Sequence, residues 1–233
     1  MAIFRKDMRE FRRNKQIIYT MAISPVGFLV APLIFLFAVP ASDASTLYQY
    51  PVLLFTLAMA ALVPVTVGAY SITGEREQGT LEPVLITPIR REELLVGKAL
   101  AAFVPTLVIA YVVFGIFLAA AALFAHPVIV SAIFAGTHVL VQLLFIPLLA
   151  GWGIWVGIAV SARSTDVRVA QQLSWLGSVP LLAILALMSL NVIAVSAGLA
   201  VGLAAVLLAI DLLAWRAAAA MFDRERLITG TRT

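Results

Sequence analysis

Residues 73–93 read TGEREQGTLEPVLITPIRREE, a charged stretch in a chain of 233 residues that is 63% hydrophobic. Five of the twelve acidic residues lie there: Glu75, Glu77, Glu82, Glu92 and Glu93. Only 12% of all residues are charged, against about 25% in soluble domains, and the mean hydropathy is +1.06. The chain is therefore predicted to be an integral membrane protein. Such a stretch is expected only where the protein meets water or a soluble partner.

Six stretches outside this segment are apolar over about 20 residues, the length that a spanning helix needs. They are residues 17–39, 52–72, 99–124, 128–160, 173–190 and 192–213. The fourth is long enough to tilt or break, and Pro147 offers a break point. The predicted fold class is an all-α membrane protein with six transmembrane helices.

All sixteen Lys and Arg residues fall in four segments that alternate with these spans. They are Arg5, Lys6, Arg9, Arg12, Arg13 and Lys15; Arg76, Arg90, Arg91 and Lys98; Arg163 and Arg168; and Arg216, Arg224, Arg226 and Arg232. Because basic residues concentrate on the cytoplasmic side, we expect a multi-pass protein of the cytoplasmic (inner) membrane with both termini cytoplasmic. The segments on the opposite side of the membrane are short and carry no Lys or Arg.

The chain is predicted to form one domain over residues 1–233. Its parts are an amphipathic leader (1–16), spans one and two (17–72), a cytoplasmic loop (73–98), spans three to six (99–213) and a cytoplasmic tail (214–233).

The leader is predicted to be an amphipathic helix at the membrane surface. Phe4, Met8 and Phe11 fall near one helical face, and basic residues such as Arg12 occupy much of the remainder. Such a helix can attract anionic lipids as a topology determinant, or it can dock a partner. Both interpretations stay open.

The charged loop is predicted to hold a short helix that lies crosswise between two spans. Gly79 permits a break, and Thr80 can cap a helix with Leu81 and Leu85 on one side. Thr87 can cap a second helix that leads into span three. The loop carboxylates are expected to contact a soluble ATPase or to pair with nearby arginines. Those residues are Glu75, Glu77 and Glu82, with Arg76, Arg90 and Arg91 as candidate partners.

Motifs for chemistry are absent from the sequence. There is no Gly-x-x-x-x-Gly-Lys-Ser/Thr phosphate loop, no His-Glu-x-x-His and no Cys. We therefore expect no catalytic residue, no bound cofactor and no metal in this chain.

A few polar and aromatic side chains lie inside the predicted spans. Four of them could line a passage for an apolar or aromatic substrate, with helix packing as the alternative: His138, Gln142, Trp152 and Trp155. Asp211 is expected to pair with Arg216 or to reach the headgroups rather than to couple to a substrate.

Small residues recur at a spacing of four, at Gly153 and Gly157 and again at Gly198 and Gly202. Such faces let helices approach closely in lipid. Packing within one subunit is favoured here over a seam between two subunits.

The sequence of residues 75–98 resembles the signature loop of ABC-2 type transporter permeases. The shared features are the acidic-basic-acidic triplet at 75–77, Gly-Thr-Leu-Glu at 79–82, Thr-Pro at 87–88 and Gly-Lys at 97–98. Residues 161–172 and the six-span layout resemble that family as well. The short corner around Asn191 departs from relatives that carry small re-entrant helices there.

This resemblance implies a type V-like ABC exporter fold with a cytoplasmic coupling helix over residues 75–85 and a connecting helix over residues 4–15. It implies a permease subunit that moves an apolar or amphiphilic substrate. The implied partners are a separate ABC ATPase that binds ATP and Mg²⁺, a second permease subunit in a homo- or heterodimer, and the bilayer, but no nucleic acid. A haem-exporter permease of cytochrome assembly is the nearest alternative. An ATP-independent intramembrane enzyme or scaffold is another, and co-purification with an ATPase would separate these classes.

Overall fold

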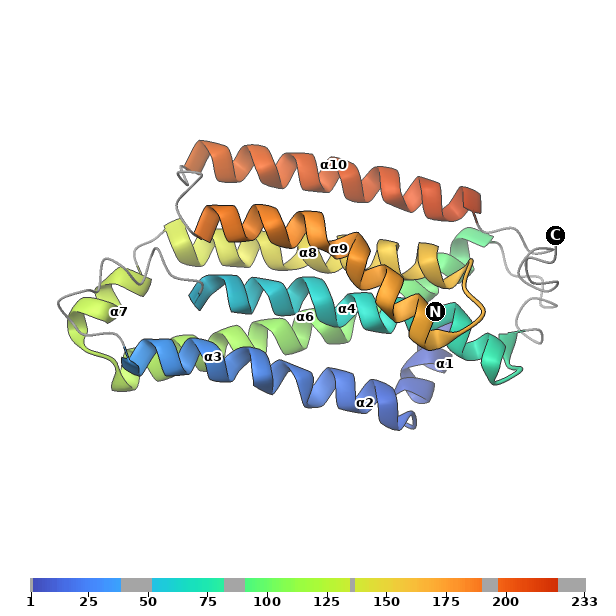
Figure 1. Ribbon diagram of the computed structural model, residues 1–233, viewed down its shortest axis with the longest axis horizontal. Coiled ribbons are helices and arrows are strands. Elements are labelled where there is room, and N and C mark those ends of the chain that lie inside the picture. Colours follow the sequence, from blue (N-terminus) through green and yellow to red (C-terminus); the bar gives the residue numbers. More distant parts are fainter. Residues whose placement is uncertain (1, 39–51, 82–90, 135–136, 190–196, 222–233) are drawn as a thin grey trace.

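The computed structural model describes residues 2–38, 52–81, 91–134, 137–189 and 197–221, and the helices in these ranges form one elongated bundle (Figure 1). No strand occurs within these ranges. The helices are α1 (Ala2–Phe11), α2 (Lys15–Ala22), α3 (Ser24–Ala38), α4 (Val52–Glu77), α6 (Arg91–Phe124), α7 (Pro127–Ile133), α8 (Thr137–Ser161), α9 (Val167–Ser189) and α10 (Ala197–Met221).

Five segments are long and apolar enough to cross a membrane. They are Ile17–Ala38, Thr56–Glu77, Glu92–Phe124, Val139–Ser161 and Gly198–Ala219. The all-helical membrane prediction is confirmed. Helix α9 occupies the position of the predicted fifth span but is not among these five, so the described chain shows five of the six expected spans.

Two predicted spans are interrupted at positions that the sequence did not specify. The first consists of α2 and α3, which meet at Ile23. Pro25 lies two residues further on, and its missing N–H and its ring prevent a continuous helix there. The stretch 128–160 is divided into α7 and α8, whereas Pro147, the expected break point, lies inside α8.

Helix α4 is the centre of the bundle and packs against α3, α6, α8 and α9. The contact between α4 and α8 brings the two backbones together at glycines. A Cβ at Gly153 would lie 2.6 Å from the carbonyl oxygen of Ala61, and one at Gly157 would lie 2.7 Å from that of Val65. No side chain fits at those distances, so this pair of small residues packs within the subunit, as the sequence predicted.

One end of the bundle collects the charged segments, and we call it the charged end. Helix α1, the end of α4, the start of α6 and the linker between α8 and α9 lie there (Figure 1). The last turns of α10 point to the same end. The described polar contacts between helices concentrate at this end.

Candidate functional site

The charged end is organised around the last turn of α4. This helix continues past Ile72, where span two was predicted to end, and stops at Glu77. Gly79 adopts φ +67°. Its N–H donates to the carbonyl of Arg76 (3.1 Å), and the Thr80 N–H donates to the carbonyl of Glu75 (2.9 Å). This pair of bonds is a Schellman motif, and it confirms the chain break predicted at Gly79.

The predicted coupling residues are therefore divided between a helix and a turn. Glu75, Arg76 and Glu77 belong to α4, which corrects the start at residue 75 that the resemblance implied for the coupling helix. Leu81 is helical and buried. Glu82 and Leu85 lie outside the described residues, as do Arg90 and the predicted cap at Thr87.

Three charged side chains are almost fully buried where α1, α4 and α6 meet. The exposed fractions are 3% for Asp7, 2% for Glu75 and 1% for Lys98. The Lys98 ammonium lies 2.6 Å from Glu75 Oε2 and 3.8 Å from Asp7 Oδ2, and it donates to the Ser71 carbonyl at 2.8 Å. One lysine of α6 therefore holds the carboxylates of two other helices.

A second lysine completes this buried charge network from the solvent side. Lys6 forms an ion pair with Glu75, and its ammonium lies 3.8 Å from Glu10 and 4.0 Å from Asp7. The described arginines do not pair with Glu75, although pairing with arginines was one of the two expectations for it. Glu75 is buried within the chain, and its carboxylate contacts the lysines of two neighbouring helices.

Burial has opposite consequences for two members of the network. It raises the pKa of Asp7 to about 6, with Glu75 and Glu10 acting in the same direction and Lys98 and Lys6 opposing it. Burial lowers the pKa of Lys6, but the hydrogen bond and charge of Glu75 outweigh it, so the net shift is upward. Lys6 therefore stays charged at neutral pH, whereas Asp7 titrates close to it.

The carboxylates of this network lie close enough together to hold a cation. Oxygens of Asp7, Glu10 and Glu75 lie within 4.8 Å of one another. The ammonium groups of Lys6 and Lys98 already lie among them. The positive charge at this position is thus supplied by lysine, and the network is a structural joint between helices.

The linker between α8 and α9 is fastened to the same turn of α4. The Thr73 hydroxyl donates to the Ser161 carbonyl (2.9 Å), and the Thr73 N–H donates to the Ser161 hydroxyl (2.9 Å). Arg76 donates to the Ser164 carbonyl, and Glu77 accepts from the Val167 N–H at 2.8 Å. Three residues in the last two turns of α4 therefore hold the end of α8, the linker and the start of α9.

The turn between α1 and α2 is fastened to α4 as well. Asn14 donates to the Tyr70 hydroxyl at 2.5 Å, and Gln78 donates to the same oxygen. A Cβ at Gly74 would lie 2.5 Å from the Tyr70 ring. Glycine at this position lets the ring lie along the helix and reach both amides.

Helix α1 has the amphipathic character that the sequence predicted. Phe11 is buried, Phe4 and Met8 are half-buried, and Arg12 is exposed. The helix rests on α6 at Gly97, where a Cβ would lie 2.8 Å from Ile3 Cβ. Because Gly97 has no side chain, α1 can approach α6 closely enough for the charge network to form.

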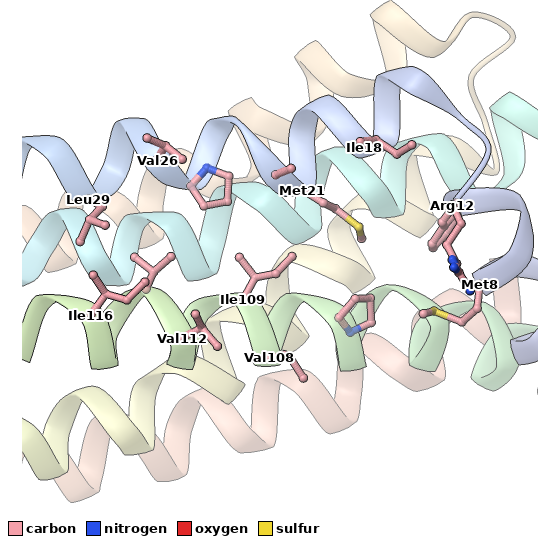
Figure 2. Close-up of a pocket in the computed structure, with 15 residues that line it drawn as sticks. Met8, Arg12, Ile18, Met21, Val26, Leu29, Val108, Ile109, Val112 and Ile116 are labelled. Atoms are coloured by element: carbon pink, nitrogen blue, oxygen red, sulfur yellow. The ribbon is translucent and has the colours of Figure 1, made fainter. Parts of the chain in front are cut away.

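Beside α1, a groove of about 530 Å³ runs between α2, α3 and α6. Figure 2 shows Met8 and Arg12 at one end of it and Leu29 and Ile116 at the other. Its walls are apolar apart from Arg12.

The predicted passage residues in the described part of the structure have different surroundings. Gln142 is buried and accepts from the Thr56 hydroxyl of α4 at 3.2 Å. Trp152 packs against the hydrophobic core around α4. Trp155 stacks edge-on against Trp215 of α10, with ring centroids 5.4 Å apart. The side chain of His138 lies outside the described part of the structure.

Asp211 does not form the expected ion pair with Arg216 within the described chain. Five residues along a helix place Arg216 about 140° around the axis, because each residue turns the helix by about 100°. The carboxylate instead lies against Gly151 of α8, where a Cβ would be 2.7 Å from Asp211 Oδ2.

Sequence reasoning placed Lys98 at the entry to span three and Lys6 among the topology charges, and it gave Asp7 no role. The available signal was the pair of acids, Asp7 and Glu10, within a basic leader, together with a lysine flanked on both sides by apolar residues. Neither signal identifies its partner, because the partners lie far apart in the chain: Lys98 is 23 residues from Glu75 and 91 residues from Asp7.

A protein-family model described as ABC-2 family transporter protein matches residues 1–215. A search of curated proteins finds no match. The match extends from α1 to Trp215 of α10, so it includes every helix that contributes to the charge network, not only the signature loop.

Proposed function

Since the chain belongs to the ABC-2 family of transporter proteins and is the membrane subunit of a transporter that works with an ABC ATPase, we propose that it is the permease of an ATP-driven exporter. The charged end faces the cytoplasm, where basic residues concentrate. Six spans cross the membrane, α9 being the fifth. ATP and Mg²⁺ are bound by the separate ATPase, and the exported substrate is apolar or amphiphilic.

The observation that carries this proposal is the convergence of contacts on the last turn of α4. Glu75 joins α1 and α6, while Thr73, Arg76 and Glu77 hold the end of α8, the linker that follows it and the start of α9. The loop that leaves this turn at Gln78 is the one that resembles the coupling loop of the family. A force applied to that loop therefore reaches three other helices directly.

Helix α4 is suited to pass such a force into the membrane. It lies against α8 backbone to backbone at Gly153 and Gly157, so the two helices cannot slide without separating. Closure of the ATPase would push the loop, tilt α4 with α8, and open a path for the substrate at the subunit interface. The buried charge network keeps α1 and α6 attached during this movement.

A second permease subunit, identical or homologous, completes the transporter. On α10 a Cβ at Gly198 or Gly202 would meet nothing within 4 Å in the described chain. This face has the spacing used for close helix contacts in lipid. We place it at the interface between permease subunits.

A photocrosslinking experiment tests the docking of the ATPase. A photoreactive residue at the exposed Gln78, next to the loop, should crosslink to a co-expressed ABC ATPase from the same genome. The matched control is the exposed Ser131 on α7 at the opposite end, which should give no such product. The purified chain alone should hydrolyse no ATP. Crosslinking from Ser131 and not from Gln78 would contradict the proposed orientation.

A further inference from the structure

A cavity of about 430 Å³ lies between α6, α8 and α10 and contains the carboxylate of Asp211. Its walls are otherwise apolar or aromatic, with Phe103, Pro147 and Leu208 among them. Asp211 Oδ1 is buried and has no hydrogen-bond partner among the described residues. A carboxylate in such surroundings is costly, so its presence calls for a partner that the described residues do not provide.

The backbone of α8 is shaped around this carboxylate. Gly151 faces it, and a Cβ there would lie 2.7 Å from Oδ2 and 3.1 Å from Cγ. Any larger residue at this position would displace the acid. The carboxylate is therefore held at the wall of the cavity.

Two tryptophans form an aromatic corner of the same cavity. Trp155 of α8 and Trp215 of α10 meet edge-on at an interplanar angle of 62°. The faces of aromatic rings attract cations within about 6 Å of the ring centre. A carboxylate beside aromatic rings and aliphatic walls is the combination that recognises an organic cation.

A second cavity, of about 530 Å³, connects this site to the charged end. It shares Val96, Leu100 and Trp215 with the first, and its outer part is lined by Glu92 and Glu93. No Lys or Arg is among the described residues that line either cavity. In a chain with a net charge of +4, an approach whose charged groups, among the described lining residues, are carboxylates attracts cations and repels anions.

We propose that the cavity around Asp211 binds a lipophilic organic cation, which enters past Glu92 and Glu93. A metal ion is disfavoured, because one carboxylate in apolar walls lacks the several oxygen ligands that such ions take. The volume is that of pockets for drug-sized molecules. This inference deepens the function proposed above, on which it rests, by naming the substrate class as cationic amphiphiles.

The test compares two probes of nearly equal size and shape and opposite charge. Tetraphenylphosphonium and tetraphenylborate are titrated against the purified full chain in nanodiscs, with equilibrium dialysis as the readout. We expect the cation to bind the wild-type chain at least about tenfold more tightly, which corresponds to about 1.4 kcal/mol. Equal binding of both probes, or tighter binding of the anion, would overturn the proposal.

Matched variants locate the site. Asp211→Asn keeps the shape of the side chain and should weaken cation binding about tenfold while leaving the binding of tetraphenylborate unchanged or improved. Trp215→Leu should weaken cation binding by a smaller factor. Asp166→Asn removes an exposed carboxylate on the linker before α9, and Trp175→Leu removes an exposed tryptophan of α9. Neither control should change binding.

The outcome is separable from that of the proposed function, because probe binding needs no ATPase. If Asp211→Asn binds the cation as tightly as the wild-type chain, the cavity is not the cation site, whether or not the ATPase crosslinks at Gln78. If the cation binds as expected but no ATPase crosslinks, the site stands and the proposed energy source fails.

Discussion

Helices α4 and α10 are of similar length and both are apolar, yet they occupy opposite positions in the fold. Of the spanning window of α4, 83% is buried inside the chain, whereas for α10 the figure is 11%. Each carries a carboxylate near the charged end. Glu75 of α4 is paired with two lysines, and Asp211 of α10 is paired with none in the described chain. Hydropathy identifies both as spans but does not distinguish the central helix from the peripheral one.

The same contrast holds for the small residues of the two regions. The space beside Gly153 and Gly157 is filled by the backbone of α4, while Gly198 and Gly202 face open space in the described chain. The same four-residue spacing therefore serves packing within the subunit on α8, whereas on α10 it leaves a surface for another molecule. The predictions below test this division between a helix that holds the subunit together and a helix that meets ligands and partners.

The largest effect is expected from Glu75→Gln. It leaves Asp7, at 3.8 Å, as the remaining described carboxylate beside the buried Lys98, and breaking a buried ion pair costs about 3–5 kcal/mol. Because the chain has no Cys, a single cysteine at the buried Ile3 reports whether α1 has detached. Maleimide should label it quickly in the Glu75→Gln variant and slowly in the parent.

The comparison variant is Asp211→Asn, which removes a carboxylate that has no partner in the described chain. It should leave the thermal stability of the detergent-solubilised chain unchanged or slightly higher. Equal losses of stability in both variants would contradict the distinction between the two acids.

A smaller effect is expected at the glycines. Gly157→Leu should destabilise the subunit by about 1–3 kcal/mol or more, because overpacking forces the α4 and α8 backbones apart. Gly198→Leu should leave the unfolding of the monomer unchanged and lower the yield of crosslinked dimer instead. The measurement is SDS-induced unfolding together with cysteine crosslinking along α10. A stability loss at Gly198 with no change in dimer yield would assign that face to internal packing.

The third effect concerns the attachment of the linker to α4. Thr73→Val removes a hydroxyl that donates to Ser161, which should cost about 1–2 kcal/mol because a buried acceptor is left unsatisfied. Thr66→Val is the control on the same helix, since its hydroxyl donates only to Val63 of α4 itself. Limited proteolysis between Ser161 and Val167 should accelerate in the first variant alone. Equal cleavage of both would show that this attachment does not hold the linker.

Composition and charge were enough to predict the helical membrane fold, the amphipathic leader and the chain break at Gly79, because each depends on residues that are close in sequence. The partners of Glu75 were not predicted, because Lys6 and Lys98 reach it only through the packing of α1 and α6 on α4. The environment of Asp211 was missed for the same reason. Its nearest residue across the cavity wall, Gly151, carries no side chain that could mark it as a neighbour.

The smallest effect separates Asp7 from Glu75 within the charge network. Burial raises the pKa of Asp7 to about 6, above its ordinary value of about 3.9, so the folded chain binds this proton more tightly than the unfolded chain. Stability from this group therefore rises as the pH falls through 6 and is lost as the pH rises above it. Between pH 7.5 and 5.5 the wild-type chain should gain on the order of 0.5–1 kcal/mol relative to Asp7→Asn. SDS-induced unfolding of both chains at the two pH values measures this difference. A relative loss on acidification would mean that Asp7 is stabilised in its ionised form by Lys98, and that it serves the joint as Glu75 does.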